Sequence, residues 1–347
     1  MRLGANVLLR LTFARLPREL FLATIARYVK SHTRRLSLAD PFGGLLTNRS
    51  IDVSIPTLRD VLRNADREHT ALGHFNFSEL VVLNAVATVA RQLGAPVLVG
   101  VSEGEREFIG VRQAAALVKS IRDEFGMPIF LNADHTHSLE KAIEAAKAGF
   151  DMVVFDASAH AFDENVEETK RAVEALKSVN PDIVVEGEIG YIGASSAIHS
   201  SVPPNMSPLT TAEEASQFVQ ATSIDVLAPA VGTMHGMLKS MASGKESKHL
   251  DNHRIAEIKR ATGIFLTLHG GSGTDVAELL AGIQAGMNVV HINTELRLAW
   301  RRGLQNALMK SPDEIAPYHL LPAAYDEVSH VVRLWLQTFQ RSSTAGA

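Results

Sequence analysis

Short apolar runs alternate with amphipathic stretches along most of this chain, beginning near Pro56. The apolar runs have the length and composition of buried strands, and the stretches between them show helical periodicity. Alternating strands and helices indicate βα units around a parallel sheet, and eight units favour a closed (β/α)8 TIM barrel over an open doubly wound sheet. The predicted strands are Leu72–Phe77, Pro96–Val101, Pro128–Ala133, Met152–Phe155, Ile183–Glu188, Val226–Ala230, Ile264–His269 and Val289–Ile292.

Capping residues mark where the predicted helices begin and end. After the eighth strand we expect a helix from about Thr294 to Met309, followed by a C-terminal helical tail, about Pro322–Gln340, packed on the outside. The expected N-caps are Ser78, Ser138 and Thr211, with Thr211 and Glu214 forming a capping box, and the expected helix ends are Gly94 and Gly149.

The segment Gly190–Pro208 differs from the rest of the chain, because it is rich in glycine, serine and proline and has no helical period. A loop of this length inside a compact domain is usually functional. It follows the fifth predicted strand, so it would cover the end of the barrel where active sites lie. We therefore predict that it is a lid.

Composition narrows the class of protein. The chain has 347 residues, 46% hydrophobic, with a net charge of −4 and no cysteine. Disulfides, thiolate ligands and a cysteine nucleophile are excluded. Nothing suggests nucleic-acid binding, and no apolar run approaches the ~18 residues of a membrane-spanning helix. We expect a cytoplasmic protein.

The first 50 residues are strongly basic, with nine Lys or Arg against two acidic residues, whereas the rest of the chain is acidic. They also contain interleaved apolar residues, but not the uninterrupted apolar core of a secretory signal. We predict a basic N-terminal extension over residues 1–55 and the barrel domain over residues 56–347. Organellar import and attachment to a membrane surface stay open as roles of the extension.

Three histidines stand at the ends of predicted strands or directly after them: His135, His235 and His269. Barrel enzymes place their chemistry at the carboxyl ends of strands, so the three side chains would share one rim. Three imidazoles leave a tetrahedral zinc ion one open position for substrate or water. Asp134 precedes His135, where a turning chain would let its carboxylate reach the ligands or the substrate. The sequence thus predicts an open metal site.

The loops after the seventh and eighth strands point to a phosphate. Gly270–Gly273 follows the seventh strand, and His291–Thr294 ends the eighth and opens a helix. Barrels often bind phosphate here, through backbone N–H groups and a helix N-terminus.

No predicted strand end carries the lysine that Schiff-base catalysis needs. A metal must therefore supply the electrophile.

These segments resemble those of the class II, metal-dependent ketose-bisphosphate aldolases, which cleave fructose or tagatose 1,6-bisphosphate. The resemblance covers about Pro56 to Arg302. It rests on Gly73–Phe77, Asn132–His135, Phe155–Ser158, Val185–Gly190, Gly232–Gly236, Leu268–Gly273 and Asn293–Leu296.

The resemblance implies a role for each matching residue. It makes His135, His235 and His269 the ligands of zinc or another divalent ion, with Glu188 beside the metal. Asp134 would protonate the aldehyde oxygen during condensation. The family's glycine loops also often hold a monovalent cation, and relatives are commonly dimers or tetramers. Contacts with dihydroxyacetone phosphate would come from Gly236, Gly270, Gly271, Ser272, Asn293 and Thr294, and Ser102 would contact the substrate.

Two positions depart from the family pattern. Relatives carry a glutamate in the lid that removes the C–H proton, whereas Tyr191–His199 contains no acid. His199 would substitute for it, or the base lies elsewhere. His291 stands where relatives usually have an asparagine that touches the substrate.

We therefore expect reversible, zinc-dependent cleavage of fructose 1,6-bisphosphate to dihydroxyacetone phosphate and glyceraldehyde 3-phosphate. The alternatives are a lyase for tagatose bisphosphate or another phosphorylated carbonyl compound, and a non-catalytic regulatory barrel that binds metal and sugar phosphate.

Overall fold

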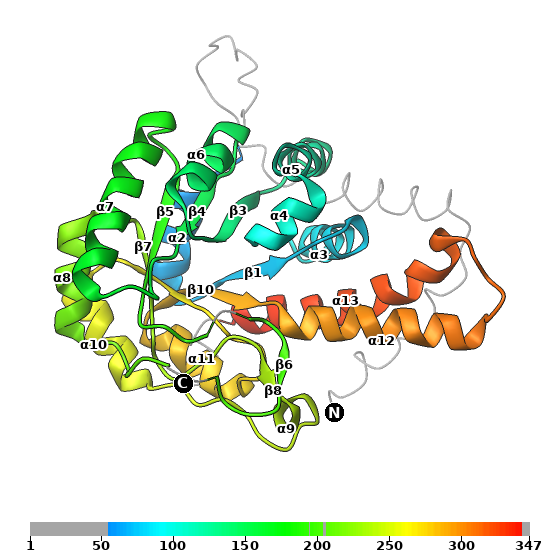
Figure 1. Ribbon diagram of the computed structural model, residues 1–347. Helices are drawn as coiled ribbons and strands as arrows, with labels where there is room; N and C mark the ends of the chain where they lie inside the picture. Colours follow the sequence, from blue (N-terminus) through cyan, green and yellow to red (C-terminus); the bar gives the residue numbers. More distant parts are fainter. Residues whose placement is uncertain (1–54, 194, 204–205, 342–347) are drawn as a thin grey trace, which may run out of the picture. The chain divides into compact units, whose positions relative to one another are not determined.

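Eight parallel strands form a closed barrel in the order β1–β10–β9–β7–β5–β4–β3–β2 (Figure 1), which confirms the predicted architecture. The structure is a computed structural model that describes residues 55–193, 195–203 and 206–341. The predicted extension, residues 1–55, lies outside this part of the chain apart from Ile55. The barrel strands are β1 (Leu72–Asn76), β2 (Val97–Val101), β3 (Ile129–Thr136), β4 (Met152–Phe155), β5 (Val184–Ile189), β7 (Val226–Pro229), β9 (Phe265–Leu268) and β10 (Met287–Ile292).

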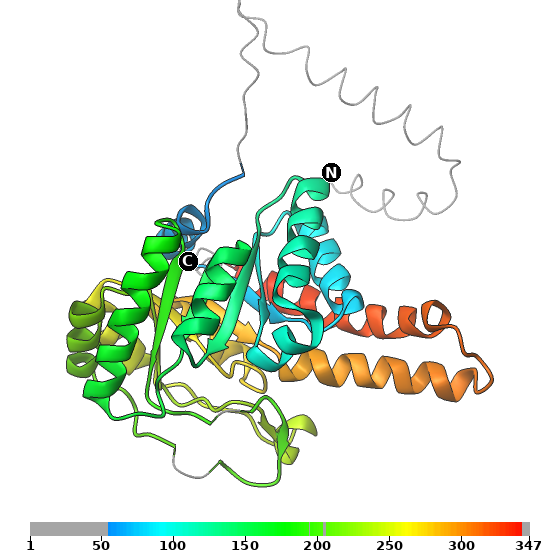
Figure 2. The same ribbon diagram turned by 45° about the horizontal axis from the view of Figure 1, so that its top comes forward.

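Helices between the strands surround the barrel (Figures 1 and 2). The last two, α12 and α13, run side by side in both views. The tail helix starts at Pro317 rather than Pro322, because proline suits the first position of a helix and only one backbone bond is lost at Pro322. The helices are α2 (Leu58–Glu68), α3 (Leu80–Leu93), α4 (Glu103–Ile109), α5 (Val111–Phe125), α6 (Leu139–Ala148), α7 (Phe162–Val179), α8 (Ala212–Thr222), α9 (Lys239–Ala242), α10 (Asn252–Thr262), α11 (Val276–Ala285), α12 (Thr294–Lys310) and α13 (Pro317–Phe339).

Most of the predicted caps are confirmed. Ser138 and the Thr211–Glu214 capping box start their helices, and Gly94 and Gly149 end theirs in the left-handed conformation. The prediction for Ser78 was wrong. The carboxylate of Glu79 caps α3 instead, since its two oxygens accept the N–H groups of Val81 (2.7 Å) and Val82 (2.9 Å) together.

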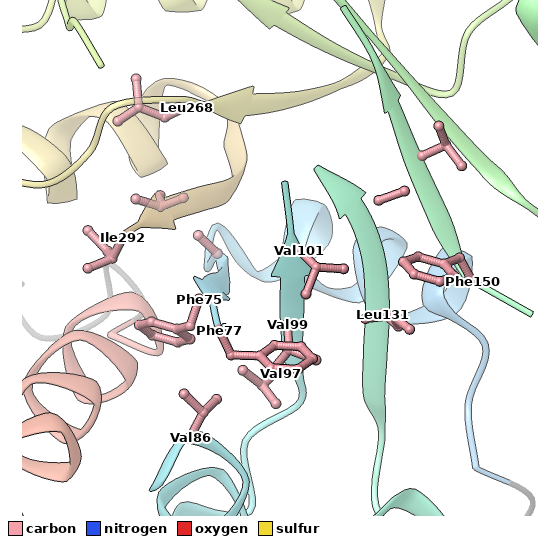
Figure 3. Packing of buried hydrophobic residues seen from close by; sticks show 14 of the residues in the cluster. Phe75, Phe77, Val86, Val97, Val99, Val101, Leu131, Phe150, Leu268 and Ile292 are labelled. Carbon is pink, nitrogen blue, oxygen red and sulfur yellow. The ribbon is translucent and has the colours of Figure 1, made fainter. Parts of the chain in front are cut away.

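The apolar core has two parts. Outward-facing strand residues such as Val99, Leu131 and Phe75 pack under the surrounding helices (Figure 3). A separate cluster takes one residue from every barrel strand and three from α2. Because these strand residues lie near the strand starts, α2 closes the amino end of the barrel. Its members are Leu58, Val61, Leu62, Leu72, Leu98, Phe130, Met152, Val184, Val226 and Val289, with Phe265 against them.

A polar layer lies above this apolar floor. Strand side chains alternate between faces, so residues two positions after the floor residues point inward again. Several of them are polar and buried: His74, Asn132, Glu186, Thr267 and His291. The barrel interior therefore changes from apolar to polar on the way to the carboxyl ends of the strands.

The predicted lid contains one short strand. Within it, β6 (Ile198–His199) pairs in parallel with β8 (Met237–Leu238), just after His235. The two short strands lie together in Figure 1, away from the barrel sheet. The lid is thus fastened to the loop that follows β7. Every helix of the described residues is too short or too polar to traverse a lipid bilayer.

Candidate active site

The structure brings three histidines together: His135 near the end of β3, His269 directly after β9, and His235 in the loop between β7 and β8. The ring of His135 lies 4.6 Å from that of His235 and 4.7 Å from that of His269, and the last two rings are 5.6 Å apart. One nitrogen from each ring lies within 4.8 Å of the others. This spacing is suitable for a shared metal ion.

A bulge in β3 lets two neighbouring residues face the same centre. The pairing of β3 with β4 shifts between Ala133 and Thr136, and His135 has a φ of 42° in the left-handed region. Regular alternation would have sent Asp134 and His135 to opposite faces. The bulge instead leaves Asp134 Oδ1 4.0 Å from His135 Nε2.

Each of the three imidazoles has one nitrogen engaged and the other directed to the centre. His135 Nδ1 donates to Asp156 Oδ2 (2.9 Å), His235 Nδ1 to the Gly193 carbonyl (2.5 Å) and His269 Nε2 to Glu186 Oε1 (2.7 Å). Partners of this kind fix the tautomer of metal-binding histidines. The nitrogens left for a metal are Nε2 of His135, Nε2 of His235 and Nδ1 of His269.

The protonation of these rings depends on their surroundings. Burial and the neighbouring His135 and His269 lower the pKa of His235 to about 3, so this ring is neutral. Burial opposes protonation of His135 too, but Asp134 and Asp156 raise its pKa to about 9. A metal at this centre would therefore displace a proton from His135 at neutral pH.

Carboxylates complete the centre. Glu188 Oε2 lies 3.2 Å from His269 Nδ1 without hydrogen-bond alignment, and 3.6 Å from His135 Nδ1. Within the described part of the chain, His269 Nδ1, Glu188 Oε2 and Asp134 Oδ1 are buried polar atoms without a hydrogen-bond partner. Such atoms are costly unless they bind something. Their clustering fits a divalent metal ion.

Asp134 is held by a chain of polar contacts. Asn76 Nδ2 donates to Asp134 Oδ2 (2.8 Å) and to Glu105 Oε2 (2.9 Å). Ser102 also donates to Glu105, through its N–H and its hydroxyl group. Burial alone would raise the pKa of Asp134, but the imidazoles of His135, His74 and His269 hold it well below its usual range. Asp134 is thus ionised, and its Oδ1 atom makes no hydrogen bond within the described residues.

His291 lies inside the barrel next to the centre. Its ring stacks on His74 with centroids 3.6 Å apart, and its Nδ1 is 3.5 Å from Asp134 Oδ1. Asn132 Nδ2 lies 3.0 Å from His74 Nε2. A side chain at Gly100 would collide with His74, since a Cβ there would lie 2.2 Å from His74 Cε1. The two histidines therefore form a buried pair beneath the predicted metal ligands.

The two glycine loops, residues 232–236 and 270–273, approach each other closely. Gly270 has a φ of 65°, and a Cβ there would lie 2.3 Å from the Met234 carbonyl. Ser272 Oγ accepts the N–H groups of Asn293 (3.2 Å) and Glu295 (3.4 Å), which joins the second loop to the start of α12. The predicted phosphate-binding residues are thus neighbours.

Gly271 differs from the other predicted phosphate contacts. Its N–H group already donates to the His291 carbonyl (3.1 Å), so it is not free for a phosphate. A Cβ at Gly271 would lie 2.8 Å from the same carbonyl oxygen. Gly271 therefore matters for close packing against β10.

The lid lies against these loops. His235 donates through its backbone N–H to the Ile192 carbonyl (3.0 Å), and Thr294 Oγ1 donates to the Ser196 carbonyl (3.2 Å). His199 Nε2 lies 3.1 Å from the Ser195 carbonyl, and its ring packs against Gly236. His199 is thus beside the phosphate loop, and its role as a base stays a prediction.

Sequence reasoning missed several residues of the site: His74, Asn76, Asp156, Glu186 and Lys248. The strand residues among them could have been found by counting every second residue along the predicted strands. Lys248 has no such signal, since it comes from a loop. It reaches the same rim and donates to three loop carbonyls.

Comparison with known proteins agrees with the geometry. The family model "Fructose-bisphosphate aldolase class-II" matches residues 56–344. The probable fructose-bisphosphate aldolase of Bacillus subtilis (strain 168) is 30% identical over 83% of this chain and 99% of its own length. The sulfofructosephosphate aldolase of Alkalicoccus urumqiensis is 29% identical over 83% and 97%. The YdjI aldolase of Escherichia coli K12, with a TM-score of 0.68 and 24% identity over 84% of this chain and 99% of its own, shares the fold. As the motifs predicted, the chain belongs to the class II fructose-bisphosphate aldolase family.

Proposed function

We propose that this protein is a zinc-dependent aldolase that reversibly cleaves fructose 1,6-bisphosphate into dihydroxyacetone phosphate and glyceraldehyde 3-phosphate. The observation that carries the proposal is the set of three converging imidazoles, each with its second nitrogen engaged, beside the carboxylate of Asp134. Membership of the family supports the reaction.

His135, His235 and His269 would hold the metal, with Glu188 beside it. Three imidazoles with an open position suit zinc. A divalent ion bound there supplies a Lewis acid that polarises a carbonyl oxygen and acidifies the neighbouring C–H group. The polar atoms left without partners at this centre support the assignment.

Asp134 moves the proton at oxygen. In cleavage, the bond between C3 and C4 breaks, and Asp134 accepts the proton of the C4 hydroxyl group as that carbon becomes the aldehyde. In condensation, Asp134 returns the proton to the aldehyde oxygen. Asn76 fixes one carboxylate oxygen, which would leave the other for the substrate.

The proton at carbon needs a second group. The electron pair of the broken bond stays on C3, which then takes up a proton to give dihydroxyacetone phosphate. We assign this transfer to His199, because it lies on the lid beside Gly236 and the lid sequence Tyr191–His199 contains no acid.

Phosphate binding falls to the glycine loops and the start of α12. The N–H groups of the first helical turn have no acceptor within the helix, and a helix N-terminus favours an anion. We assign the phosphate contacts to Gly236, Gly270, Ser272, Asn293 and Thr294. Ser102 and His291 face the sugar in our assignment.

We also propose that the protein is a homo-oligomer, a dimer or tetramer, and acts in the cytoplasm. Large apolar side chains near the α12–α13 turn support association, since Ile315 is 90% exposed and Met309 is 64% exposed. Such exposed apolar groups often mark interaction surfaces.

The test is an assay of purified, zinc-loaded protein with fructose 1,6-bisphosphate and, separately, tagatose 1,6-bisphosphate, following triose phosphate. We expect cleavage of the fructose compound by the wild type and much slower cleavage by Asp134→Asn. Faster cleavage of the tagatose compound would reassign the substrate. Zinc binding without turnover of either compound would instead favour the regulatory barrel.

A further inference from the structure

Lys248 is a buried lysine that reaches the two glycine loops from outside the barrel strands. It lies in the segment after α9 and is 3% exposed. Its Nζ donates to the carbonyl oxygens of Met234, Gly236 and Gly270, each at 2.7 Å. Its backbone N–H donates to the Gly273 carbonyl (2.9 Å), so the residue is fixed at both ends.

Three carbonyl acceptors require the charged form of this side chain. An ammonium group has three N–H donors, whereas a neutral amine has two and would direct its lone pair at the third carbonyl. Burial lowers the pKa of Lys248 to about 7, and Glu295 opposes that shift. The three short contacts to carbonyl oxygens favour the ammonium, as they would favour any small cation.

The three carbonyls belong to peptide units whose N–H groups are also engaged. The Met234 carbonyl shares its peptide unit with the His235 N–H group, which donates to the Ile192 carbonyl. The Gly236 carbonyl shares its unit with the Met237 N–H group, which donates to the Ala197 carbonyl. The Gly270 carbonyl shares its unit with the Gly271 N–H group, which donates to the His291 carbonyl. The first two acceptors belong to the lid and the third to β10.

Lys248 therefore holds several parts of the site in register. Two of its contacts flank His235 and the third follows His269 directly. Without a positive charge, three carbonyl dipoles would face one another in a buried space, which is unfavourable. The loops would separate, and the metal ligands and phosphate contacts would move with them.

We propose that Lys248 is a positioning residue whose ammonium group takes the place of a free monovalent cation between the glycine loops. The resemblance led us to expect a separate cation there, but this chain carries the charge on its own side chain. The proposal rests on the proposed function only in the experiment that measures cleavage of fructose 1,6-bisphosphate.

The experiment uses the zinc-loaded full chain and the variant Lys248→Ala, which leaves space for a small cation. Lys245→Ala is the matched control, because Lys245 lies in the same loop and is exposed. Thermal unfolding and fructose 1,6-bisphosphate cleavage are measured at constant ionic strength in tetramethylammonium, K⁺, ammonium or propylammonium chloride.

We expect the wild type and Lys245→Ala to give the same melting temperature and KM with K⁺ as with tetramethylammonium. In tetramethylammonium, Lys248→Ala should have a lower melting temperature and a KM about tenfold or more higher, because charged hydrogen bonds are lost. K⁺, ammonium or propylammonium should restore both values. A role in packing alone would show no such rescue.

Two results would overturn the proposal: a wild type stabilised by K⁺ as strongly as the variant is, or a variant that no small cation rescues. If Lys248→Ala folds only with K⁺ or an alkylammonium ion, the proposal holds, and if it folds with none, the proposal fails. The melting experiment needs no substrate, so it decides the matter even if fructose 1,6-bisphosphate is not cleaved.

Discussion

The carboxylate of Glu186 decides which nitrogen of His269 can face a metal. Glu186 is fully buried, accepts from His269 Nε2 at 2.7 Å and accepts from Thr267 Oγ1 at 2.6 Å. In Glu186→Gln the shape is kept and the charge is lost. The amide can still accept from His269, but only if its NH2 group turns to Thr267. In the other orientation, the NH2 group faces Nε2 and would move the ring proton to Nδ1, the nitrogen left for the metal.

The expected cost follows from this geometry. A charged hydrogen bond becomes a neutral one of roughly half the strength. Loss of such a partner typically lowers metal affinity about 10- to 100-fold. This corresponds to about 1.4 to 2.8 kcal/mol of binding free energy.

Zinc affinity is measured at neutral pH by competition with a chromophoric chelator. Thr267→Val is the matched control, because it removes a partner of Glu186 but leaves the charge beside His269. We expect the control to lose less than Glu186→Gln. If Glu186→Gln binds zinc within about twofold of the wild type, Glu186 does not orient His269 and the assignment of the ligand atoms is wrong.

Three further predictions concern proton transfer and pH. Asp134→Asn should slow cleavage about 10²- to 10⁴-fold while zinc affinity changes little, and near-normal turnover would remove Asp134 as the acid–base group. His199→Ala should slow exchange of the C–H proton of dihydroxyacetone phosphate with solvent, and unchanged exchange would place the base elsewhere. Burial and the neighbouring His269 and His135 lower the pKa of His74 to about 4, although Asp134 opposes the shift. The unfolded chain therefore binds this proton more readily between about pH 6.5 and 4, so stability falls as the pH falls through that window, by up to about 3 kcal/mol. Urea unfolding of chelator-treated protein gives the free energy of unfolding at pH 7 and at pH 4.5. Between these two pH values, His74→Gln should lose less of this free energy than the wild type, and an equal loss would refute the burial of a neutral His74.

The barrel and the convergence of His135, His235 and His269 could be predicted because both follow local rules. Buried strands separated by capped helices give the fold, and residues at strand ends share one rim. The polar layer was also visible in principle, since Glu186 and Glu188 are two apart on one strand. It was missed because the strands were interpreted as uniformly apolar.

Other features depend on contacts between distant parts of the chain. The bulge that turns both Asp134 and His135 to the centre appears only when β3 pairs with β4. The choice of ring nitrogen depends on Asp156, Gly193 and Glu186, which come from other segments. No local pattern predicts such partners.

The central claim is that a divalent metal held by His135, His235 and His269 is required for aldolase activity. The most direct measurement follows metal content and triose phosphate release in the same sample, before chelation, after it and after zinc is restored. We predict that metal content and triose phosphate release fall together on chelation and recover together when zinc is restored. His235→Ala should neither retain zinc nor release triose phosphate. Undiminished cleavage of fructose 1,6-bisphosphate by fully metal-depleted protein would contradict the account.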